Sequence, residues 1–383
     1  MNFEAAVKAA QRIADETLAP DAARNDKEAR FSTEAVAALG RSGLLGLTVP
    51  ESAHGSGLGP RAFAEVTATL AQADGSVAMV YMMHVAATQM IAAGAAAHAG
   101  ARAALADIGA GKHLTTLAFS EKGSRSHFWA PVSKAERAGD GVRITAHKSW
   151  VTSAGHADSY VVAAQKPGST GATDTTMYLV RSDSKGLKVA APWDGMGLRA
   201  NASSPMLLEA VEVPDERRLT DDGAGFKAML EVVLPWFNLG QAAVGLGLSR
   251  AAVAATTKHL KESRFEHMNN VSLGEALPNL RASLASMQID TDGLAARVAD
   301  LCTHLETPGP LTVLRVLEAK AAANETAIRV TSAAMRTCGG AAFSKHTGIE
   351  RNFRDAHAGA VMAPTVDQLH DFIGKALLGI PLF

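Results

Sequence analysis

The sequence predicts an α+β protein in which an N-terminal helical domain, a middle antiparallel β-domain and a C-terminal helical bundle follow one another. Three observations lead to this order. Apolar residues recur at helical spacing through 1–112, short segments rich in β-forming residues occupy 113–222, and helical spacing returns in 223–383. A chain of 383 residues has room for two or three domains. We therefore expect domain boundaries at these three ranges.

Composition and charge are those of a soluble globular protein. Hydrophobic residues make up 47% of the chain and charged residues 20%. The 37 basic and 38 acidic side chains give a net charge of -1, so we expect no nucleic-acid partner. Cys302 and Cys338 lie far apart and no signal peptide is visible, which favours a cytoplasmic protein. No histidine or cysteine set has metal-ligand spacing, so we expect no metal.

The first stretch predicts helices. The segment 3–18 has helical spacing and is followed by Pro20, and Ser32 can cap a second helix that runs to about residue 44. Another amphipathic helix is expected around 63–70. The run 77–94 is apolar nearly all round but is interrupted by polar residues, so we expect a buried helix and no membrane span.

The pattern changes at about residue 113 and changes back at about residue 225. Expected strands are Leu114–Phe119, Val142–Ala146, Tyr160–Ala164, Met177–Val180, Leu187–Ala190 and Met206–Val213. Expected helices are Phe226–Leu234, Leu239–Ser263, Leu277–Leu305, Leu311–Arg336 and Thr365–Leu378.

Four segments carry motifs of one known family. They are Leu117–Ser126, similar to a Ser-Glu strand-to-loop segment; Lys148–Gly155, similar to Lys-x-Trp-x-Thr; Gly197–Ser203, similar to Gly-x-Arg-x-Ser-x-Thr and followed by Val211–Pro214; and Asp222–Phe226. Through them the whole chain resembles the acyl-CoA dehydrogenase family. The resemblance implies a helical domain, a middle antiparallel β-barrel and a C-terminal four-helix bundle. It also implies bound FAD and a homotetramer or homodimer.

The residue types of the second motif suit a flavin ring. Trp150 offers a large flat surface, and Thr152, two positions along the same strand, points to the same face. The resemblance implies that FAD is held at the positions of Phe119, Ser120, Ser126, Trp150 and Thr152. Ser126 in its Gly/Ser loop suits a pyrophosphate oxygen because small residues allow close backbone approach.

The adenine end of FAD depends on C-terminal residues. The resemblance implies that Arg264 and the turn Gly339-Gly340 touch the cofactor of a neighbouring subunit, and that Thr365 belongs to the cofactor site. The sequence departs from the family after Arg264, where Phe265–Met268 replace the usual Thr-Phe-Gly-Lys. FMN therefore remains a possible cofactor in place of FAD.

The family's catalytic base is missing. Family members place a glutamate shortly after Met-Arg-Asp-Ala, and counting on from Phe353–Ala356 puts that position on Ala363. A minority place it in the helix after Gly-x-Gly-Phe, which falls here on Pro235. A dehydrogenase with this sequence needs another carboxylate, and Asp367 and Glu231 are the candidates.

Other chemistries on the same fold need no such base. One is a monooxygenase that uses reduced flavin. The resemblance implies that in this branch a histidine near the position of His84 hydrogen-bonds the flavin peroxide, and Ser153 is a further candidate beside the ring. The alternative for His84 is a core histidine paired with a backbone carbonyl. A third possibility is another reaction on a thioester, such as desulfination, and a fourth is a degenerate flavin-binding protein.

Partners and substrate follow from the same resemblance. The implied substrate is an acyl thioester, and the implied redox partner is an electron acceptor or a flavin reductase. We expect the cavity to be lined by Met82, Met83, Trp236 and Met362, whose bulk favours a short or branched acyl group.

Overall fold

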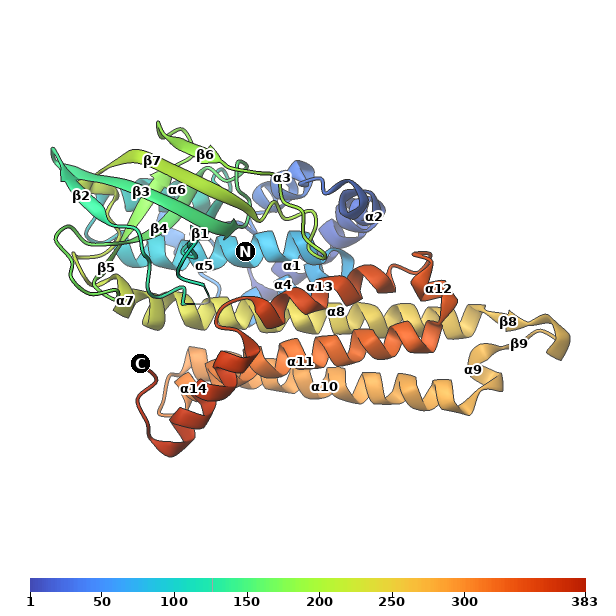
Figure 1. Ribbon diagram of the computed structural model, residues 1–383. Helices are drawn as coiled ribbons and strands as arrows, with labels where there is room; N and C mark the ends of the chain where they lie inside the picture. The colour runs from blue at the N-terminus through green and yellow to red at the C-terminus, as the bar shows by residue number, and fades with distance from the viewer. Residues whose placement is uncertain (126) are drawn as a thin grey trace.

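In the computed structural model, which describes residues 1–125 and 127–383, the chain passes from helices through strands and back to helices (Figure 1). The N-terminal helices are α1 (Phe3–Ile13), α2 (Ala19–Glu28), α3 (Thr33–Arg41), α4 (Pro60–Ala73), α5 (Gly75–Gly94) and α6 (Ala99–Gly109). Ser32 caps α3 as expected, since its side chain accepts the Ala35 N–H at 3.2 Å.

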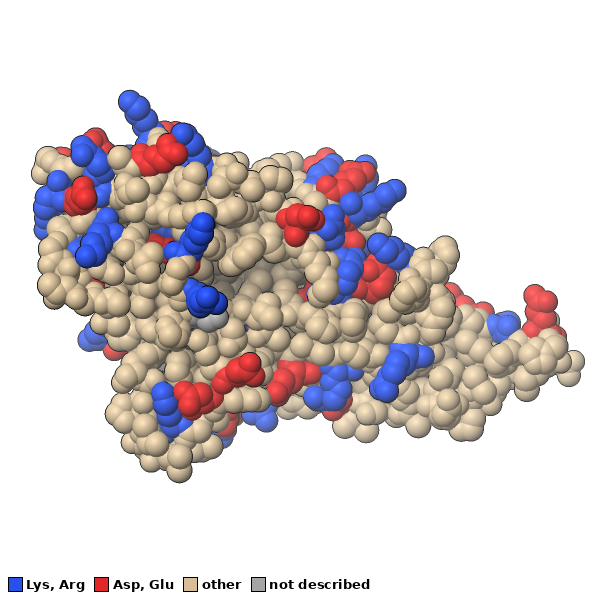
Figure 2. All heavy atoms as spheres, in the orientation of Figure 1, with Lys and Arg blue, Asp and Glu red and all other residues tan. Residues whose placement is uncertain are grey.

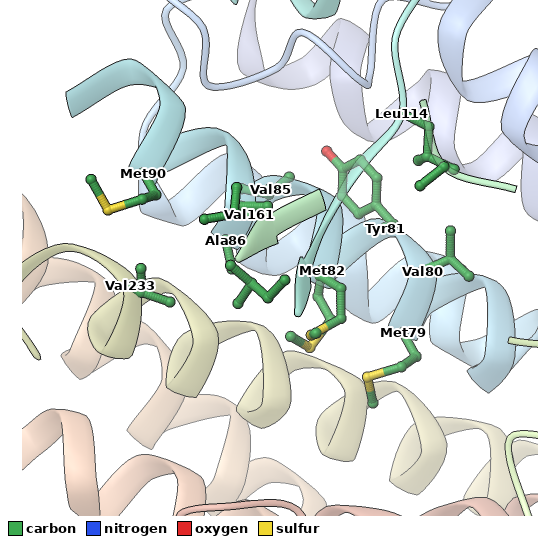
Figure 3. Close-up of a cluster of buried hydrophobic side chains, with 14 of the residues drawn as sticks. Met79, Val80, Tyr81, Met82, Val85, Ala86, Met90, Leu114, Val161 and Val233 are labelled. Atoms are coloured by element: carbon green, nitrogen blue, oxygen red, sulfur yellow. The ribbon is translucent and has the colours of Figure 1, made fainter. Parts of the chain in front are cut away.

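Helix α5 is the core of this part of the molecule. Its side chains are buried on all sides, and Asp74 starts the helix by accepting the N–H groups of Ser76 and Val77. Figure 3 shows α5 packed against Val161 of the β-domain and against Val233, which precedes the long C-terminal helix. The helix therefore joins all three parts of the fold.

The middle domain consists of two sheets. One contains β1 (Thr115–Ala118), β4 (Ser159–Gln165) and β5 (Thr175–Arg181), in the order β1-β4-β5. The other contains β2 (Ala135–Ala138), β3 (Gly141–Val151), β6 (Leu187–Val189) and β7 (Ser204–Pro214), in the order β2-β3-β7-β6.

The expectation of a purely antiparallel β-domain is wrong for one pair of strands. β1 and β4 pair in parallel, with Thr115 opposite Ser159. The chain between them crosses to the other sheet to form β2 and β3 and then returns, so β1 and β4 enter their sheet in the same direction. The remaining ladders, β4 with β5 and those of the second sheet, are antiparallel.

The C-terminal part is built on three long helices. It contains α7 (Gly225–Ala228), α8 (Leu234–Glu262), α9 (Leu273–Ala276), α10 (Pro278–Glu306), α11 (Thr312–Cys338), α12 (Gly340–Phe343), α13 (Ile349–Val361) and α14 (Val366–Leu378). A small hairpin, β8 (Arg264–Phe265) with β9 (Val271–Ser272), follows α8, and Figure 1 shows it projecting at the end of the bundle far from the sheets. Pro235 lies directly after the π-helical turn Met229–Val233, inside a helical stretch that is continuous from Gly225 to Glu262. Its missing N–H falls where the helix changes its hydrogen-bonding pattern.

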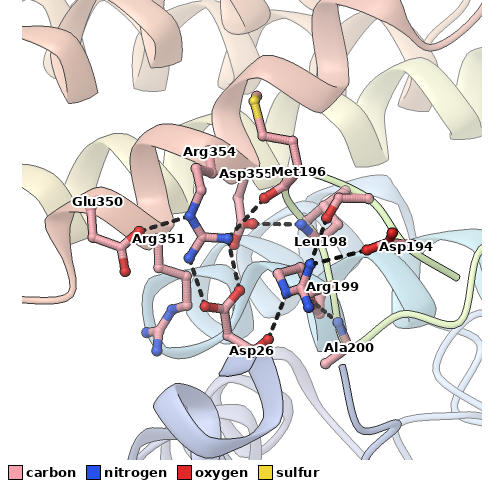
Figure 4. A network of polar contacts seen from close by, with 12 residues as sticks. Asp26, Asp194, Met196, Leu198, Arg199, Ala200, Glu350, Arg351, Arg354 and Asp355 are labelled. Carbon is pink, nitrogen blue, oxygen red and sulfur yellow. Dashed lines mark hydrogen bonds and ion pairs between the residues drawn. The ribbon is translucent and has the colours of Figure 1, made fainter. Parts of the chain in front are cut away.

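A network of charged groups joins the three parts beside the middle domain (Figure 4). Arg354 of α13 donates to both carboxylate oxygens of Asp26 in α2, at 2.9 and 2.6 Å, and to Glu350 at 2.7 Å. Arg354 also reaches the Met196 carbonyl at 2.9 Å. Arg199 donates to the Asp26 carbonyl at 2.9 Å. The loop around residues 194–200 is thus fixed from both helical parts, which matters because it leads into the site described next.

Two helical stretches, Gly75–Gly94 and Gly225–Glu262, are long and apolar enough to cross a membrane by length and composition. Both are mostly buried inside this fold, as core helices are.

Candidate functional site

A cavity of about 530 Å³ lies between the β-domain and the C-terminal helices. Its wall comes from the ends of β1 and β3, the loop before β7, helix α5, the start of α8 and the end of α13. The lining residues are Met83, Leu117, Phe119, Ser120, Glu121, Arg125, Phe128, Ser149, Trp150, Thr152, Trp193, Leu198, Asn201, Ser203, Val233, Leu234, Phe237, Ala358, Val361, Met362 and Ala363. Figure 2 shows this face hollowed between the two parts, with basic side chains at one margin. The size is typical of a cofactor or substrate pocket.

The aromatic wall depends on a bulge in β3. The strand alternates buried and exposed residues up to Lys148, and its pairing with β7 then shifts register before Val151. Trp150 takes a φ of 56° in this bulge and stands 65% exposed on the cavity rim. A large residue in the left-handed region is uncommon, and a bulge is a usual means of aiming a side chain. Trp193 meets it edge to face, with ring centroids 5.7 Å apart.

A buried ion pair fixes the loop that closes one side of the cavity. Lys148 Nζ donates to Glu121 Oε1 at 2.5 Å and to the Ala163 carbonyl at 2.7 Å. Glu121 also accepts the N–H groups of Val132 and Ser133, at 2.7 and 2.8 Å, and the Ser133 hydroxyl. Burial alone would raise the pKa of Glu121, but the Lys148 charge and these hydrogen bonds hold it below its ordinary value. Glu121 is therefore an ionised structural group with no lone pair left for proton transfer.

The structure brings four of the expected flavin ligands together. Phe119, Ser120, Trp150 and Thr152 all line the cavity. Thr152 is 2% exposed, and its hydroxyl lies 3.1 Å from that of Ser203. A flavin ring needs a flat apolar surface to cover it and hydrogen-bonding groups at its polar edge, so these aromatic and hydroxyl residues fit the cofactor. Their contact with the cofactor stays a prediction.

Two further expected ligands stand apart from this set. Ser126 lies outside the described residues. Ser153 is buried just behind the lining with a φ of 60°, and its hydroxyl has no hydrogen-bond partner among the residues that the structure describes.

The wall opposite the sheets contains the position of the missing base. Met362 and Ala363 line the cavity, with Phe237 of α8 beside them. Behind them the fully buried Lys320 donates to the carbonyls of Met362 and Pro364, at 2.8 and 2.7 Å, and lies 5.1 Å from the Phe237 ring centre. No acidic partner of Lys320 is present among the described residues, and burial lowers the pKa of its ammonium well below the ordinary value. The turn that carries Ala363 is thus clamped from behind.

Neither candidate replacement for the base lies in this wall. Asp367 is exposed in the first turn of α14, outside the lining. Glu231 is exposed on the outer side of its helix and lies 3.9 Å from Lys227. Within the described residues, Glu121 is the one carboxylate of the lining, and it is fully engaged. The described part of the lining therefore offers no free carboxylate to act as the base.

His84 is held by the backbone on both sides. Its Nε2–H donates to the Leu45 carbonyl at 2.9 Å, and its Nδ1 accepts the Thr115 N–H at 3.1 Å. These bonds fix one neutral tautomer and leave no ring nitrogen for the cavity, whose lining does not include His84. The geometry favours the alternative of a core histidine over a catalytic one. Burial lowers the pKa of His84 to about 4.

Acid stability gives a test of this assignment. Because the pKa of His84 falls from 6.5 to about 4 on folding, its contribution is present above pH 6.5 and is lost as the pH falls to 4. We expect the free energy of unfolding of wild type, relative to His84→Gln, to drop by about 3 kcal/mol across that window. Glutamine can donate to Leu45 and accept from Thr115, so it is the matched control. Burial raises the pKa of Asp355 to about 7, an opposite trend that the difference between the two proteins cancels. Urea denaturation of both proteins at several pH values measures the difference in their free energies of unfolding. A difference that stays constant between pH 6.5 and 4 would contradict the assignment of His84.

The residues expected at the adenine end lie elsewhere. Arg264 begins β8, where it donates to the Asn270 carbonyl at 2.9 Å, and the Gly339-Gly340 turn joins α11 to α12. Figure 1 shows both at the end of the bundle away from β3. Thr365 caps α14, accepting the Gln368 N–H at 3.3 Å. Within one chain none of these residues lines the cavity.

The expected apolar lining was half right. Met83 and Met362 line the cavity, whereas Met82 and Trp236 pack in the core, where Trp236 lies against Phe63 with ring centroids 5.7 Å apart. Met82 is fully buried, and its sulfur lies 3.6 Å from the side-chain amide of Gln241 in α8, so it packs against that helix and not in the cavity wall.

Sequence reasoning missed several lining residues. Trp193, Asn201, Ser203 and Phe128 come from loops, where no periodicity shows which side chains turn inward. Asn201 and Ser203 stand at the Ser and Thr positions of the third motif, so the motif itself was the available signal.

Comparison with known proteins agrees with the resemblance. Models of the N-terminal, middle and C-terminal domains of acyl-CoA dehydrogenase match residues 2–103, 116–211 and 239–365. The chain is 28% identical over 391 residues to the mitochondrial short/branched chain specific acyl-CoA dehydrogenase of Bos taurus, covering 98% of this chain and 85% of that one. Butyryl-CoA dehydrogenase from Megasphaera elsdenii superposes with a TM-score of 0.90 at 23% identity, covering 98% of both chains. FMN-bound TdsC from Paenibacillus sp. A11-2 superposes with a TM-score of 0.89 at 21% identity, also covering 98% of both. At these identities the two solved structures establish a shared fold alone.

Proposed function

The chain belongs to the acyl-CoA dehydrogenase family, and from that premise we propose that it is a flavin-dependent oxidoreductase that acts on an acyl thioester. FAD is the cofactor we propose, with FMN as the alternative. The observation that carries the proposal is the cavity itself, in which Phe119, Ser120, Trp150 and Thr152 come together. When bound there, a flavin accepts a hydride from the substrate.

The residues of the chain have separate parts in this proposal. Trp150 and Phe119 would cover a bound flavin ring, and Ser120 and Thr152 would hydrogen-bond its polar edge. The wall of Met83, Phe237 and Met362 excludes water and limits the size of the acyl group. No group at Ala363 takes up the α-proton, so proton removal depends on solvent and is slow.

We propose that the active form is a homotetramer or homodimer. Arg264 and the Gly339-Gly340 turn lie at the end of the bundle away from the cavity, so they can serve a cofactor only in another subunit. A cytoplasmic setting is the one we propose, because Cys302 and Cys338 are both buried unpaired thiols. The redox partner we propose is a separate electron acceptor.

Anaerobic titration of the purified flavoprotein with a panel of acyl-CoAs tests the function. We expect at least one acyl-CoA to bleach the flavin absorbance, at a slow rate because the base is missing. Substitution of Trp150 by alanine should weaken flavin binding about tenfold, since a stacked aromatic contact is lost. Protein that stays colourless with both FAD and FMN would contradict the proposal.

The absence of a free carboxylate among the described lining residues favours one second candidate, a monooxygenase supplied with reduced flavin. It predicts no bleaching by acyl-CoA. It also predicts oxygen uptake when NADH and a separate flavin reductase are added. The two assays together separate the candidates.

A further inference from the structure

Asn201 occupies a tight turn at the inner end of the cavity. In the same turn, Leu198 and Ala202 take φ values of 49° and 50°. Its N–H donates to the Leu198 carbonyl at 3.2 Å, and its own carbonyl accepts the Ser153 N–H at 2.9 Å. The backbone of Asn201 is therefore fully used, and the side chain is 0% exposed.

The side-chain amide has one group in use and one group free. Oδ1 accepts the Ser203 N–H at 3.0 Å, which fixes the orientation of the amide because the reverse orientation would oppose two donors. Nδ2 then has no partner among the described residues. A buried donor left without an acceptor is destabilising, and such a group in a cavity wall points to a ligand.

The hydrogen-bonding groups beside this amide are uncharged, although Arg125 also lines the cavity. The hydroxyls of Thr152 and Ser203 lie 3.1 Å apart beside it, and the Ser153 hydroxyl behind them is also unpartnered among the described residues. The charge of Glu121 is balanced by Lys148. These uncharged groups favour an uncharged acceptor over a carboxylate or phosphate, whose lost hydration they would not offset.

We propose that Asn201 Nδ2 donates a hydrogen bond to a neutral carbonyl-type acceptor of the ligand that fills this end of the cavity, and that Asn201 is a specificity-determining residue. The inference rests on the proposed function. Two sources carry this chemistry, the pyrimidine edge of a flavin and the carbonyl of a thioester. A site built to hydrogen-bond an acceptor discriminates against ligands that lack it.

Substitution Asn201→Asp tests the role most directly. Aspartate keeps the oxygen that accepts the Ser203 N–H and replaces the free donor by an acceptor. Asn201→Ser is the second variant, since serine is the residue of the family motif at this position and suits the turn. The matched control is Asn2→Asp, at the exposed N-cap of α1, where aspartate keeps the acceptor for the Ala5 N–H.

Two affinities are measured at pH 8 for all four proteins. The first is the dissociation constant of FAD and FMN for the flavin-free protein; the second is that of butyryl-CoA for the flavin-loaded protein, followed by the flavin spectrum. We expect one of the two dissociation constants to rise about tenfold for both Asn201 variants, and neither to change for Asn2→Asp. The arm that changes identifies the source of the acceptor.

The outcomes are distinguishable. Asn201 variants that match wild type in both arms overturn the role of Asn201 and leave the proposed function intact. Wild-type protein that binds neither FAD nor FMN overturns the proposed function and the ligand named here. Near-ultraviolet circular dichroism of each variant verifies the fold. If the aspartate variant is unfolded, the affinities of the serine variant test the role of Asn201.

Discussion

Replacement of Ala363 by glutamate is expected to accelerate flavin reduction by acyl-CoA by about 10²–10⁴-fold. That range is what a positioned general base contributes to proton removal. The substitution restores a carboxylate at the position that corresponds to the family's usual base, and the structure shows that this position faces the cavity. Single-turnover bleaching of the flavin under anaerobic conditions, at saturating acyl-CoA, measures the change.

The residues around Ala363 can accommodate a glutamate side chain. Lys320 holds the carbonyls on either side of the position, so the turn has little freedom to move when the side chain grows. The cavity of about 530 Å³ has room for the added atoms.

The matched control is Ala363→Gln, which has the same shape and cannot accept the proton. We expect it to bleach no faster than wild type. If the glutamate and glutamine variants have equal rates, the position does not reach the α-carbon and the alignment of this wall with the family's base is wrong. If acyl-CoA perturbs the flavin spectrum of both variants but reduces the flavin in neither, the result favours the monooxygenase candidate.

The sequence was informative where a side chain's direction follows from its element. Helical spacing placed α5 in the core, and the Lys-x-Trp-x-Thr motif brought Trp150 and Thr152 to one cavity. Regular strand alternation does not direct Trp150 into the cavity, as was expected. A bulge and a positive φ direct it, and the spacing of residues reveals neither feature.

The sequence did not reveal the partners or directions of side chains that are set by tertiary contacts. Nothing in the residues around His84 shows that Leu45 and Thr115 occupy both its ring nitrogens, because those partners are 39 and 31 positions away. Asp367 stood close to Ala363 in sequence, yet the start of α14 turns it to solvent. The free donor of Asn201 is visible only after every other partner in its turn has been assigned.

Substitution Glu121→Gln is expected to lower the free energy of unfolding by about 3–5 kcal/mol. Removing one member of a buried ion pair leaves the other charge without compensation, and here that charge is the fully buried Lys148. The effect reaches the cavity because Glu121 also holds Val132 and Ser133, the end of the loop that carries Phe128. Flavin affinity should therefore fall as well. Urea denaturation at pH 7 and flavin titration measure the two effects.

The chain contains an exposed pair of the same residue types as a control. Lys188 on β6 and Glu209 on β7 lie 2.7 Å apart with side chains 59% and 53% exposed, and Glu209→Gln should cost less than about 1 kcal/mol. The double variant Glu121→Gln with Lys148→Met should recover part of the loss, because it removes the stranded charge. Wild-type stability should also decline as the pH falls below 4.5, since the pKa of Glu121 is depressed on folding and its contribution is lost on protonation. A cost for Glu121→Gln no greater than that for Glu209→Gln would show that the buried pair does not fix the cavity wall.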